Sequence, residues 1–539
     1  MLIQADRSSA NRHQRILRLV RERVRSIIPI VPVDPNSLPH DPAILKQMLI
    51  DLTTQLEKTQ RLLTQLLAAK SGTRSEQLSA DQLRLFAQEI GAELPKAATE
   101  AENDSNQDDS LPPGSGSGDE EQVRPRGRRP LPSHLKRERI VHDLAEQDKH
   151  CASCHEDLRL MGEETSERYE YIPAQMLVIE DACLKYACAC TVKTATKPPQ
   201  PIEKSTAGAS LLAQVIVSKV ADHLPVHRQA KILRRFGVEI ADQTMCGWMR
   251  QCAELLDPLH GRLKEFVLSS KVVGTDDTPV KVLDRSLVRT TRKGRFWPYL
   301  GDRNHVAAVF DYTPTRERAG PERFLKSYRG YLQADAYVAY DSFFTNPARG
   351  LVEVACWAHT RRHFHQALDA DPARMGAVLA YIAQLYAVEK RARRSGVEGD
   401  ELRLLREQAS RPVLQQLHEY LLKIRDQVLP KSEAGQAVSY ALKNWMALTR
   451  YCEDGDLAID NNHTERSLRG IAVGRNNWTF LGSDRGGWTM AVLRSFVASC
   501  ELANVDPFAW FQDVLSRIGA HSIQRLDELL PHRWAAARL

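Results

Sequence analysis

The sequence predicts a multidomain α+β protein, with an N-terminal coiled coil, a small zinc-binding β module, a helical domain, an α/β core interrupted by helices, and a helical C-terminal tail. Three observations predict this organisation. Leucines recur at alternating spacings of four and three from Leu45 to Leu66, as a coiled-coil seam requires. Two close cysteine pairs follow. Beyond residue 270, short β-branched and aromatic runs precede a long stretch with helical periodicity.

The composition is that of an ordinary globular protein. The chain has 539 residues, of which 42% are hydrophobic and 26% are charged, and this length allows about three to four domains. The net charge of +6 is too small for the whole chain to indicate nucleic-acid binding. No apolar run approaches the roughly 18 residues that a membrane span needs, and scattered cysteines are typical of a reducing compartment. We therefore expect a cytoplasmic protein without a membrane partner.

The N-terminal third contains three segments of different character. Residues 1–40 form a basic arm, and residues 41–95 carry the leucine seam. The seam would dimerise the chain, although one amphipathic helix packed on its own domain would show the same spacing. Residues 96–135 are an acidic low-complexity linker followed by a basic strip from Arg124 to Pro130. The strip resembles an AT-hook, which lies in the minor groove, and a plain basic linker is the alternative. Its arginines are Arg124, Arg126, Arg128 and Arg129.

Two cysteine pairs lie within residues 136–200 and predict a structural zinc site. Cys151 and Cys154 are three positions apart, whereas Cys188 and Cys190 are two apart. Two thiolate pairs brought together by a β-ribbon can enclose a tetrahedral Zn²⁺, and four thiolates leave no open position for catalysis. The second pair is one residue tighter than the common spacing, so the fourth ligand stays open. The substitutes are Cys183, His150 and His155, and unligated buried cysteines are the alternative to any zinc site.

Residues 201–268 predict a compact helical domain. Apolar residues from Leu212 to Val220 have helical spacing, and a second run follows at Ile232 to Phe236. This periodicity fits both a helix-turn-helix reader of DNA ends and a scaffold.

Adjacent carboxylates follow the first strand of the core, residues 269–490. Val272 and Val273 read as the end of a buried strand, and Asp276 and Asp277 come soon after. Pro279 is expected to end ladder pairing nearby. Two buried carboxylates are costly unless a positive group pairs with them, and Mg²⁺ prefers such hard oxygen ligands. A solvated Asp-Asp turn is the alternative.

The order of the predicted elements resembles a ribonuclease-H-like core, in which the first and fourth strands lie side by side at the centre. Asp335 ends the fourth predicted strand, so it would meet Asp276 at adjacent strand ends. After the opening strand, the predicted elements are strands at 295–300 and 305–312, a short helix at 324–328, and strands at 331–337 and 351–356.

A helical insertion at about 370–450 precedes the third acid of the core. The segment from Asp460 to Arg469 begins with three residues that can cap a helix, which places Glu465 in its first or second turn. Arg466 and Arg469 are three apart and share a side near Glu465. The stretches 474–478 and 482–487 are predicted loops beside the site, and residues 491–539 are a predicted helical tail.

Four motifs, taken together and in order, resemble a transposase of the insertion-sequence-66 family, within the wider DDE group of transposases and integrases. The resemblance runs from about residue 45 to the C-terminus. This chain departs from the family's usual Cys-x-x-Cys at the second zinc pair, and its basic arm has no counterpart there. The motifs are Thr275-Asp-Asp-Thr-Pro279, Leu332-Gln-Ala-Asp-Ala-Tyr337, Cys356-Trp-Ala-His-Thr-Arg-Arg362 and Asp460-Asn-Asn-His-Thr-Glu-Arg466.

The resemblance implies a catalytic triad of Asp276, Asp335 and Glu465 that binds two Mg²⁺ ions, with Mn²⁺ as the alternative metal. Asp277 is the alternative to Asp276. Two bound metal ions would activate water to cut the end of an insertion sequence, and then activate the freed 3′-OH to join target DNA.

Further side chains surround this predicted site. We expect Arg466, Arg469 and Arg475 to hold DNA phosphates, with pairing to local acids as the alternative. Cys356 and His359 are similar to a Cys-x-x-His motif of several DDE families, and packing is the favoured interpretation of this pair.

The resemblance also implies the partners. These are the terminal inverted repeats of the element, target DNA, a homodimer or higher oligomer, and accessory proteins encoded by the same element, in a bacterial, nucleoid-associated setting. Two rival functions stay open: a ribonuclease-H-like nuclease of DNA recombination that cuts without joining, and a DNA-binding regulator without catalysis.

Overall fold

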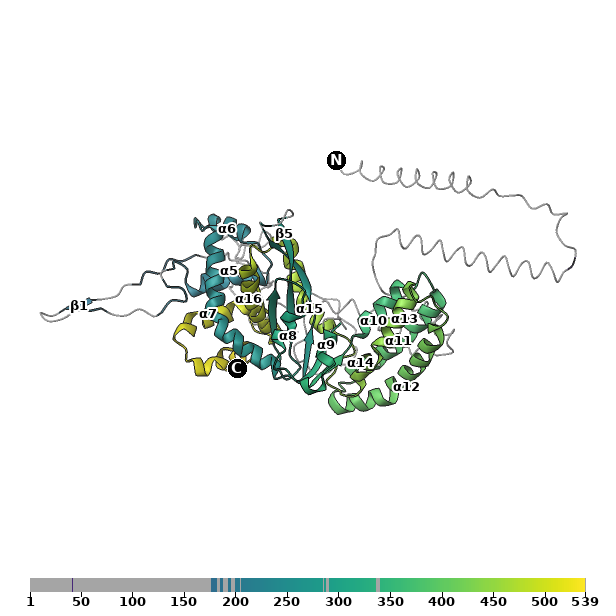
Figure 1. Ribbon diagram of the computed structural model, residues 1–539. Helices are drawn as coiled ribbons and strands as arrows, with labels where there is room; N and C mark the ends of the chain where they lie inside the picture. The colour runs from purple at the N-terminus through teal and green to yellow at the C-terminus, as the bar shows by residue number, and fades with distance from the viewer. Residues whose placement is uncertain are drawn as a thin grey trace, which may run out of the picture. The chain divides into compact units, whose positions relative to one another are not determined.

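The computed structural model describes residues 41, 176–181, 185–187, 192–194, 199–203, 205–284, 286, 290–335 and 340–538. The described part is mixed α+β and mostly helical, with one mixed sheet (Figure 1). None of its helices is both long and apolar enough to cross a membrane. The predicted leucine seam, the basic strip with Arg124, Arg126, Arg128 and Arg129, and the cysteines Cys151, Cys154, Cys188 and Cys190 lie outside the described residues.

A short hairpin flanks the second predicted cysteine pair. β1 (Lys185–Ala187) and β2 (Val192–Thr194) pair antiparallel, with Ala187 opposite Val192. A β-ribbon is therefore present where the sequence predicted one for the zinc module.

The helical prediction for residues 201–268 is confirmed. α5 (Ala209–Val220), α6 (Val226–Arg235) and α7 (Asp242–Leu268) follow one another with short connections. Their inner faces share one hydrophobic core with the sheet and the C-terminal helices. α5 packs on α17 (Pro507–Arg517), and α7 packs on α16 (Asp484–Leu502). The segment therefore supports the sheet.

The central sheet has six strands in mixed orientation. β5 (Thr291–Leu300) pairs antiparallel with β3 (Val272–Thr275), β4 (Thr278–Leu283) and β6 (Ala308–Thr313). β3 pairs parallel with β7 (Gly330–Gln333), and β7 with β8 (Leu351–Val354). The predicted adjacency of the strands that precede Asp276 and Asp335 is therefore confirmed.

Two local predictions in the sheet region are wrong. Pro279 lies within β4, opposite Arg295, instead of ending the pairing. Among the named strands β4 pairs with β5 alone, so it lies at an edge of the sheet. A proline is tolerated at an edge because no strand on the other side needs a backbone N–H at that position. The helix predicted at 324–328 is α8 (Ala319–Phe324), which begins earlier because Pro321 fits the first turn of a helix.

Helices occupy the predicted insertion, and their buried residues form a second hydrophobic core that also includes Val272 of β3 and Val354 of β8. The insertion follows α9 (Asp341–Phe344) and α10 (Trp357–Gln366), and its helices gather in one group (Figure 1). The chain that comes back from the insertion is bound to the end of β8: Ala355 N–H donates to Ala447 O and Trp357 N–H donates to Ile459 O, both at 3.1 Å. The insertion consists of α11 (Pro372–Arg394), α12 (Gly399–Arg425), α13 (Glu433–Lys443) and α14 (Trp445–Thr449).

The predicted loops around residue 480 are largely helical, so that prediction is wrong. Residues 474–478 end α15 (Asn462–Trp478), because Leu468, Ile471 and Gly474 continue its buried face. Ser483 caps α16 (Asp484–Leu502) by accepting a hydrogen bond from Gly486 N–H, so residues 484–487 are helical too.

The C-terminal helices pack on the sheet, as predicted. α16 is buried along most of its length and lies on β6, where Ser495 Oγ accepts a hydrogen bond from Phe310 N–H at 2.8 Å. α17 (Pro507–Arg517) and α18 (Pro531–Ala536) follow it. α16 runs across residue 490, where the sequence placed the start of the tail.

Candidate active site

Asp276 and Asp277 occupy a break in one continuous line of pairing on β5. Thr275 lies opposite Tyr299 and Thr278 lies opposite Phe296, so the register does not change between β3 and β4. The same register puts Asp276 opposite Pro298, which has no N–H to donate to a ladder. The strand pairing is therefore interrupted at the two carboxylates, and the proline opposite Asp276 accounts for the interruption.

Asp277 is engaged by two arginines. Arg295 Nη1 lies 2.6 Å from Asp277 Oδ2, and Arg316 Nη2 lies 2.7 Å from Asp277 Oδ1. The Asp277 side chain is only 3% exposed. Both carboxylate oxygens thus have charged partners from the protein, which is the arrangement of a structural ion pair.

Asp276 faces other acids instead. Its Oδ1 accepts a hydrogen bond from Asp277 N–H at 2.7 Å. Burial of the carboxyl, together with the negative charges of Asp335 and Glu465, raises the pKa of Asp276 to about 8. The three acids of the predicted triad are therefore close enough to repel one another.

Asp335 follows β7 and is held by backbone contacts on both sides. Ala334 N–H donates to Val354 O at 3.1 Å, and the hydroxyl of Tyr440 donates to the carbonyl of Asp335 at 3.1 Å. Because β3 and β7 are parallel neighbours, Asp276 and Asp335 leave the sheet at the same edge.

Glu465 reaches this edge because the start of α15 docks on β3. Asn461 occupies the N-cap position, but its side chain donates to Thr275 O at 2.8 Å rather than capping the helix. Gly274 allows the approach, since a Cβ there would collide with Thr464 Oγ1. Of the three predicted capping residues, Asp460 accepts the N–H of Asn462 through its Oδ1 at 3.2 Å.

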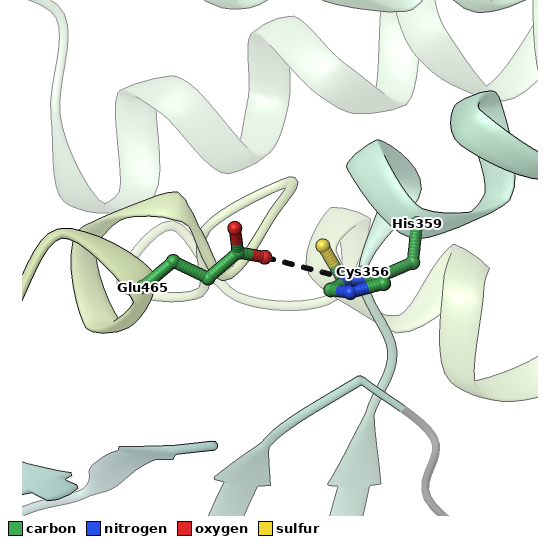
Figure 2. Close-up of side chains that lie close together, drawn as sticks. All are labelled: Cys356, His359 and Glu465. Carbon is green, nitrogen blue, oxygen red and sulfur yellow. Dashed lines mark ion pairs between the residues drawn. The ribbon is translucent and has the colours of Figure 1, made fainter. Parts of the chain in front are cut away.

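Cys356 and His359 lie beside Glu465 and form a second group with it. Figure 2 shows Glu465 and His359 pointing toward each other from two helices, with the Cys356 sulfur beside them. His359 Nδ1 lies 3.6 Å from Glu465 Oε1, and one ligand atom from each of the three residues falls within 4.8 Å of the others.

The environment of Cys356 fits packing. Its Sγ accepts a hydrogen bond from Asn461 N–H at 3.2 Å, and burial raises the pKa of the thiol to about 12. A thiol with this pKa is neutral near pH 7 and is a weak metal ligand.

The pKa of Glu465 is raised by burial and by the charges of Asp460 and Asp335, whereas His359 and Arg362 oppose that shift. A group of mutually repelling carboxylates on one sheet edge offers the hard oxygen ligands that Mg²⁺ or Mn²⁺ prefers. Asp276, Asp335 and Glu465 are carboxylates of this kind, although the one group of three ligand atoms within 4.8 Å of one another in the described part of the chain is that of Cys356, His359 and Glu465.

The three arginines predicted to hold DNA have different surroundings. Arg466 and Arg469 are exposed on α15. Arg475 instead directs its Nη1 onto β4, donating to Thr278 Oγ1 at 2.9 Å and to Pro279 O at 2.8 Å.

Sequence reasoning missed Arg295 and Arg316, and it expected Asn461 to cap a helix rather than to bind β3. Arg295 and Arg316 lie in no motif, because each acts on Asp277 from a distant part of the chain. The position of Arg295 in β5, opposite Pro279, could have been found only if the strand register had been known.

The comparisons with known proteins agree along most of the chain. Residues 204–489 match the family model described as "Transposase IS66 family", and residues 495–532 match the "IS66 C-terminal element". Residues 148–191 match the "zinc-finger binding domain of transposase IS66", and residues 60–140 match "Transposase C of IS166 homeodomain".

Three similar relatives come from Sinorhizobium fredii (strain NBRC 101917 / NGR234). The uncharacterized protein y4jD is 31% identical over 521 residues, which cover 93% of this chain and 98% of the relative. The uncharacterized protein y4qI is 30% identical, covering 90% of this chain and 89% of the relative. The uncharacterized protein y4hP is 30% identical, covering 76% and 77%.

Proposed function

Because the chain belongs to the IS66 family of transposases, we propose that it cuts DNA at the ends of an insertion sequence and joins the freed 3′-OH to target DNA. Family membership implies an enzyme of DNA transposition. The cleavage and strand-transfer steps, and the residues that perform them, are the proposal.

The observation that carries the proposal is the mutual repulsion of Asp276, Asp335 and Glu465. Burial and two neighbouring negative charges raise the pKa of Asp276 to about 8. Such a shift at a sheet edge is typical of a functional site. Two Mg²⁺ ions held there would supply charge neutralisation at the attacking and leaving oxygens.

Asp276, Asp335 and Glu465 would hold the divalent ions in this proposal, and the ions would offset the repulsion that Asp335 and Glu465 exert on Asp276. Asp277 is not part of the set, because both of its oxygens are taken by Arg295 and Arg316. The hydroxyl that attacks DNA comes from water and then from the cut DNA end, so no protein nucleophile is needed.

The strand order supports a ribonuclease-H-like core for this chemistry. The order is β6, β5, β3, β7 and β8, with β4 continuing the line of β3. Three antiparallel strands followed by two parallel ones put the ends of β3 and β7 at the centre, where Asp276 and Asp335 lie.

The remaining parts have supporting roles. The zinc-finger match supports a structural Zn²⁺ in residues 148–191. Exposed Arg466 and Arg469, in the first half of α15, are suited to hold DNA phosphates near Glu465. The macromolecular partners proposed here are the terminal inverted repeats of the element, target DNA and a second copy of the chain.

Three substitutions test the triad: Asp276→Asn, Asp335→Asn and Glu465→Gln. Each should abolish Mg²⁺-dependent nicking of a duplex that carries the inverted repeats flanking the gene, while binding to that duplex persists. Asp400→Asn is a matched control, because this acid is 96% exposed on the helical insertion and loses the same charge. Normal nicking by any of the three triad variants would remove that residue from the proposal.

The rival functions predict different products. A nuclease would nick the duplex but would not join pre-cut ends to a target plasmid. A regulator without catalysis would bind the repeats and nick nothing at any Mg²⁺ or Mn²⁺ concentration.

A further inference from the structure

Helix α6 has one face that is entirely cationic or neutral. Its buried positions recur every three or four residues from Val226 to Leu233 and face the core. The helix contains no acidic residue. The opposite, exposed face carries His227, Arg228, Lys231, Arg234 and Arg235.

The charges of this face are not neutralised locally. In the described part of the chain, no carboxylate forms an ion pair with Arg228, Lys231, Arg234 or Arg235. The next helix differs, since α7 pairs Arg250 with Glu254 at 3.1 Å and Arg262 with Glu265 at 3.0 Å. A cluster of unpaired cations produces a local positive potential that attracts a polyanion.

The start of α6 is anchored beside the helix that carries Glu465. His223, in the connection between α5 and α6, lies with its Nδ1 3.4 Å from where a Cβ of Gly474 would stand. Lys219 of α5 lies 5.1 Å from the centre of the Trp478 ring. These contacts join the α5–α6 connection to the second half of α15.

The part of α15 between Glu465 and the contact with the α5–α6 connection is short enough for one bound duplex to cover. Glu465 and Gly474 are nine positions apart on α15, which is about 14 Å along the helix axis. A DNA strand covers that distance in about four nucleotides. Exposed Arg466 and Arg469 lie on the stretch of α15 between the two points.

We propose that the exposed face of α6 binds the phosphate backbone of double-stranded DNA next to the bond that is cut, through Arg228, Lys231, Arg234 and Arg235. The position of the cut bond rests on the proposed function; the binding surface itself does not. Clustered Lys and Arg without amide side chains among them favour phosphate contacts over base reading. The inner face of the helix packs as scaffold, and the outer face would bind DNA without reading its sequence, unlike the helix-turn-helix reader that the periodicity also fits.

The test is the salt dependence of binding to a fluorescent duplex of random sequence, measured on the full-length protein without added Mg²⁺. The variant combines Arg228→Ala, Lys231→Ala, Arg234→Ala and Arg235→Ala. Each lost phosphate contact lowers the slope of log affinity against log salt by about 0.9, so we expect a total loss of about 3.6 for the four contacts. The variant should weaken binding to random and terminal-repeat duplexes alike.

A matched control removes four exposed cations from the helical insertion. It combines substitutions to Ala at positions that have no ion pair within the described residues, and its slope should change by less than about 1. A second variant, with Lys at the three arginine positions of α6, keeps the charge and should keep the slope. The control positions are Arg391, Arg393, Lys423 and Lys431.

Two results would overturn the inference: equal slopes for the α6 variant and the control, or a loss confined to the terminal-repeat duplex, which would indicate base reading. Thermal unfolding of each protein monitors the fold, and if the fourfold variant unfolds, the pair Arg228→Gln and Lys231→Gln gives the same test with an expected slope change of about 2. Because the readout is binding without metal, it reports on α6 even if the nicking assay finds no cleavage.

Discussion

Arg295 Nη1 lies 2.6 Å from Asp277 Oδ2, and this contact separates the roles of two adjacent carboxylates. Asp277 is paired with cations of the protein, whereas the negative charges of Asp335 and Glu465 help to raise the pKa of Asp276. Neighbouring acids in one sequence motif thus have opposite electrostatic surroundings.

The first prediction uses this difference. Asp277→Asn should lower the free energy of unfolding by about 2 kcal/mol, because it leaves Arg295 and Arg316 without their common partner. Asp276→Asn should not destabilise the metal-free protein, because burial and the charges of Asp335 and Glu465 already disfavour the ionised form of Asp276 near pH 7. Added Mg²⁺ should raise the melting temperature of the wild type and of Asp277→Asn, but not that of Asp276→Asn. The reverse pattern would make Asp277 the metal ligand.

The second prediction concerns the docking of α15 on β3. Gly274→Ala should push Thr464 and the first turn of α15 away from the sheet, since the new Cβ overlaps Thr464 Oγ1. A displacement of about 1 Å at Glu465 should reduce the nicking rate about 100-fold. Adding Thr464→Ala to this variant should restore most of the rate, because the next nearest atom, Asn461 Oδ1, is 3.5 Å from the Cβ position. Thr464→Ala alone is the control, and failure of the double variant to recover would reject this account of how Glu465 is placed.

The third prediction separates two arginines of α15. Arg475→Ala should destabilise the protein by about 2 kcal/mol, because its Nη1 holds Thr278 and Pro279 of β4. Arg466→Ala should leave stability unchanged and lower the salt slope of DNA binding by about 1. The measurements are thermal unfolding and the salt dependence of DNA binding for both variants. A lowered salt slope for Arg475→Ala with unchanged stability would show that Arg475 binds DNA rather than holding β4.

The fourth prediction is a pH dependence of stability that arises from His260. Its Nε2 lies 3.1 Å from Ser495 Oγ between α7 and α16, and burial, with the nearby charge of Lys264, lowers the pKa of His260 to about 4. The unfolded chain binds this proton at about pH 6.5 and the folded chain does not. Stability should therefore fall as the pH drops from about 6.5 to about 4, and should not change above that window on account of this residue.

His260→Gln should remove that part of the pH dependence. The measurement is the difference in melting temperature between wild type and variant across the window. A difference that stays constant from pH 7 down to about 4 would show that His260 titrates equally in both states.

The fifth prediction concerns the zinc module. The purified protein should contain about one Zn²⁺ per chain, and Cys151→Ser or Cys154→Ser should remove it. Cys188→Ser and Cys190→Ser should differ from each other if the tighter second pair supplies only one ligand. Metal analysis of the four variants gives the answer, and full zinc content in all of them would exclude the site.

The strands of the core could be predicted because short runs of β-branched and aromatic side chains mark them in the sequence. Val272 and Val273, Phe296 and Trp297, and Val309 and Phe310 are buried β-branched or aromatic residues within strands. The sequence does not predict β4, because a proline is expected to end strand pairing near residue 279. At the edge of the sheet the missing N–H of Pro279 costs no ladder hydrogen bond, so β4 forms. A sequence does not show which strand has a free edge.

The helical end of α15 was missed for a related reason. Gly474, Asn476 and Asn477 favour loops by their intrinsic propensity, yet Leu468 and Ile471 are buried and continue the helix against the sheet. Tertiary packing therefore overrode local preference. In the same way, the spacing of Asp276, Asp335 and Glu465 along the chain gave no geometry of its own, and their convergence was expected from the resemblance to a known family.

Two backbone hydrogen bonds, Ala355 with Ala447 and Trp357 with Ile459, join the end of β8 to the chain that comes back from the helical insertion. The chain thus departs from β8 and returns to it at almost the same place before it turns into α15. The insertion also packs on the sheet, since its hydrophobic core includes Val272 of β3 and Val354 of β8, and Tyr440 donates to the carbonyl of Asp335. A substitution that repacks the insertion would therefore displace the strands that precede Asp276 and Asp335, although it lies far from both in the sequence.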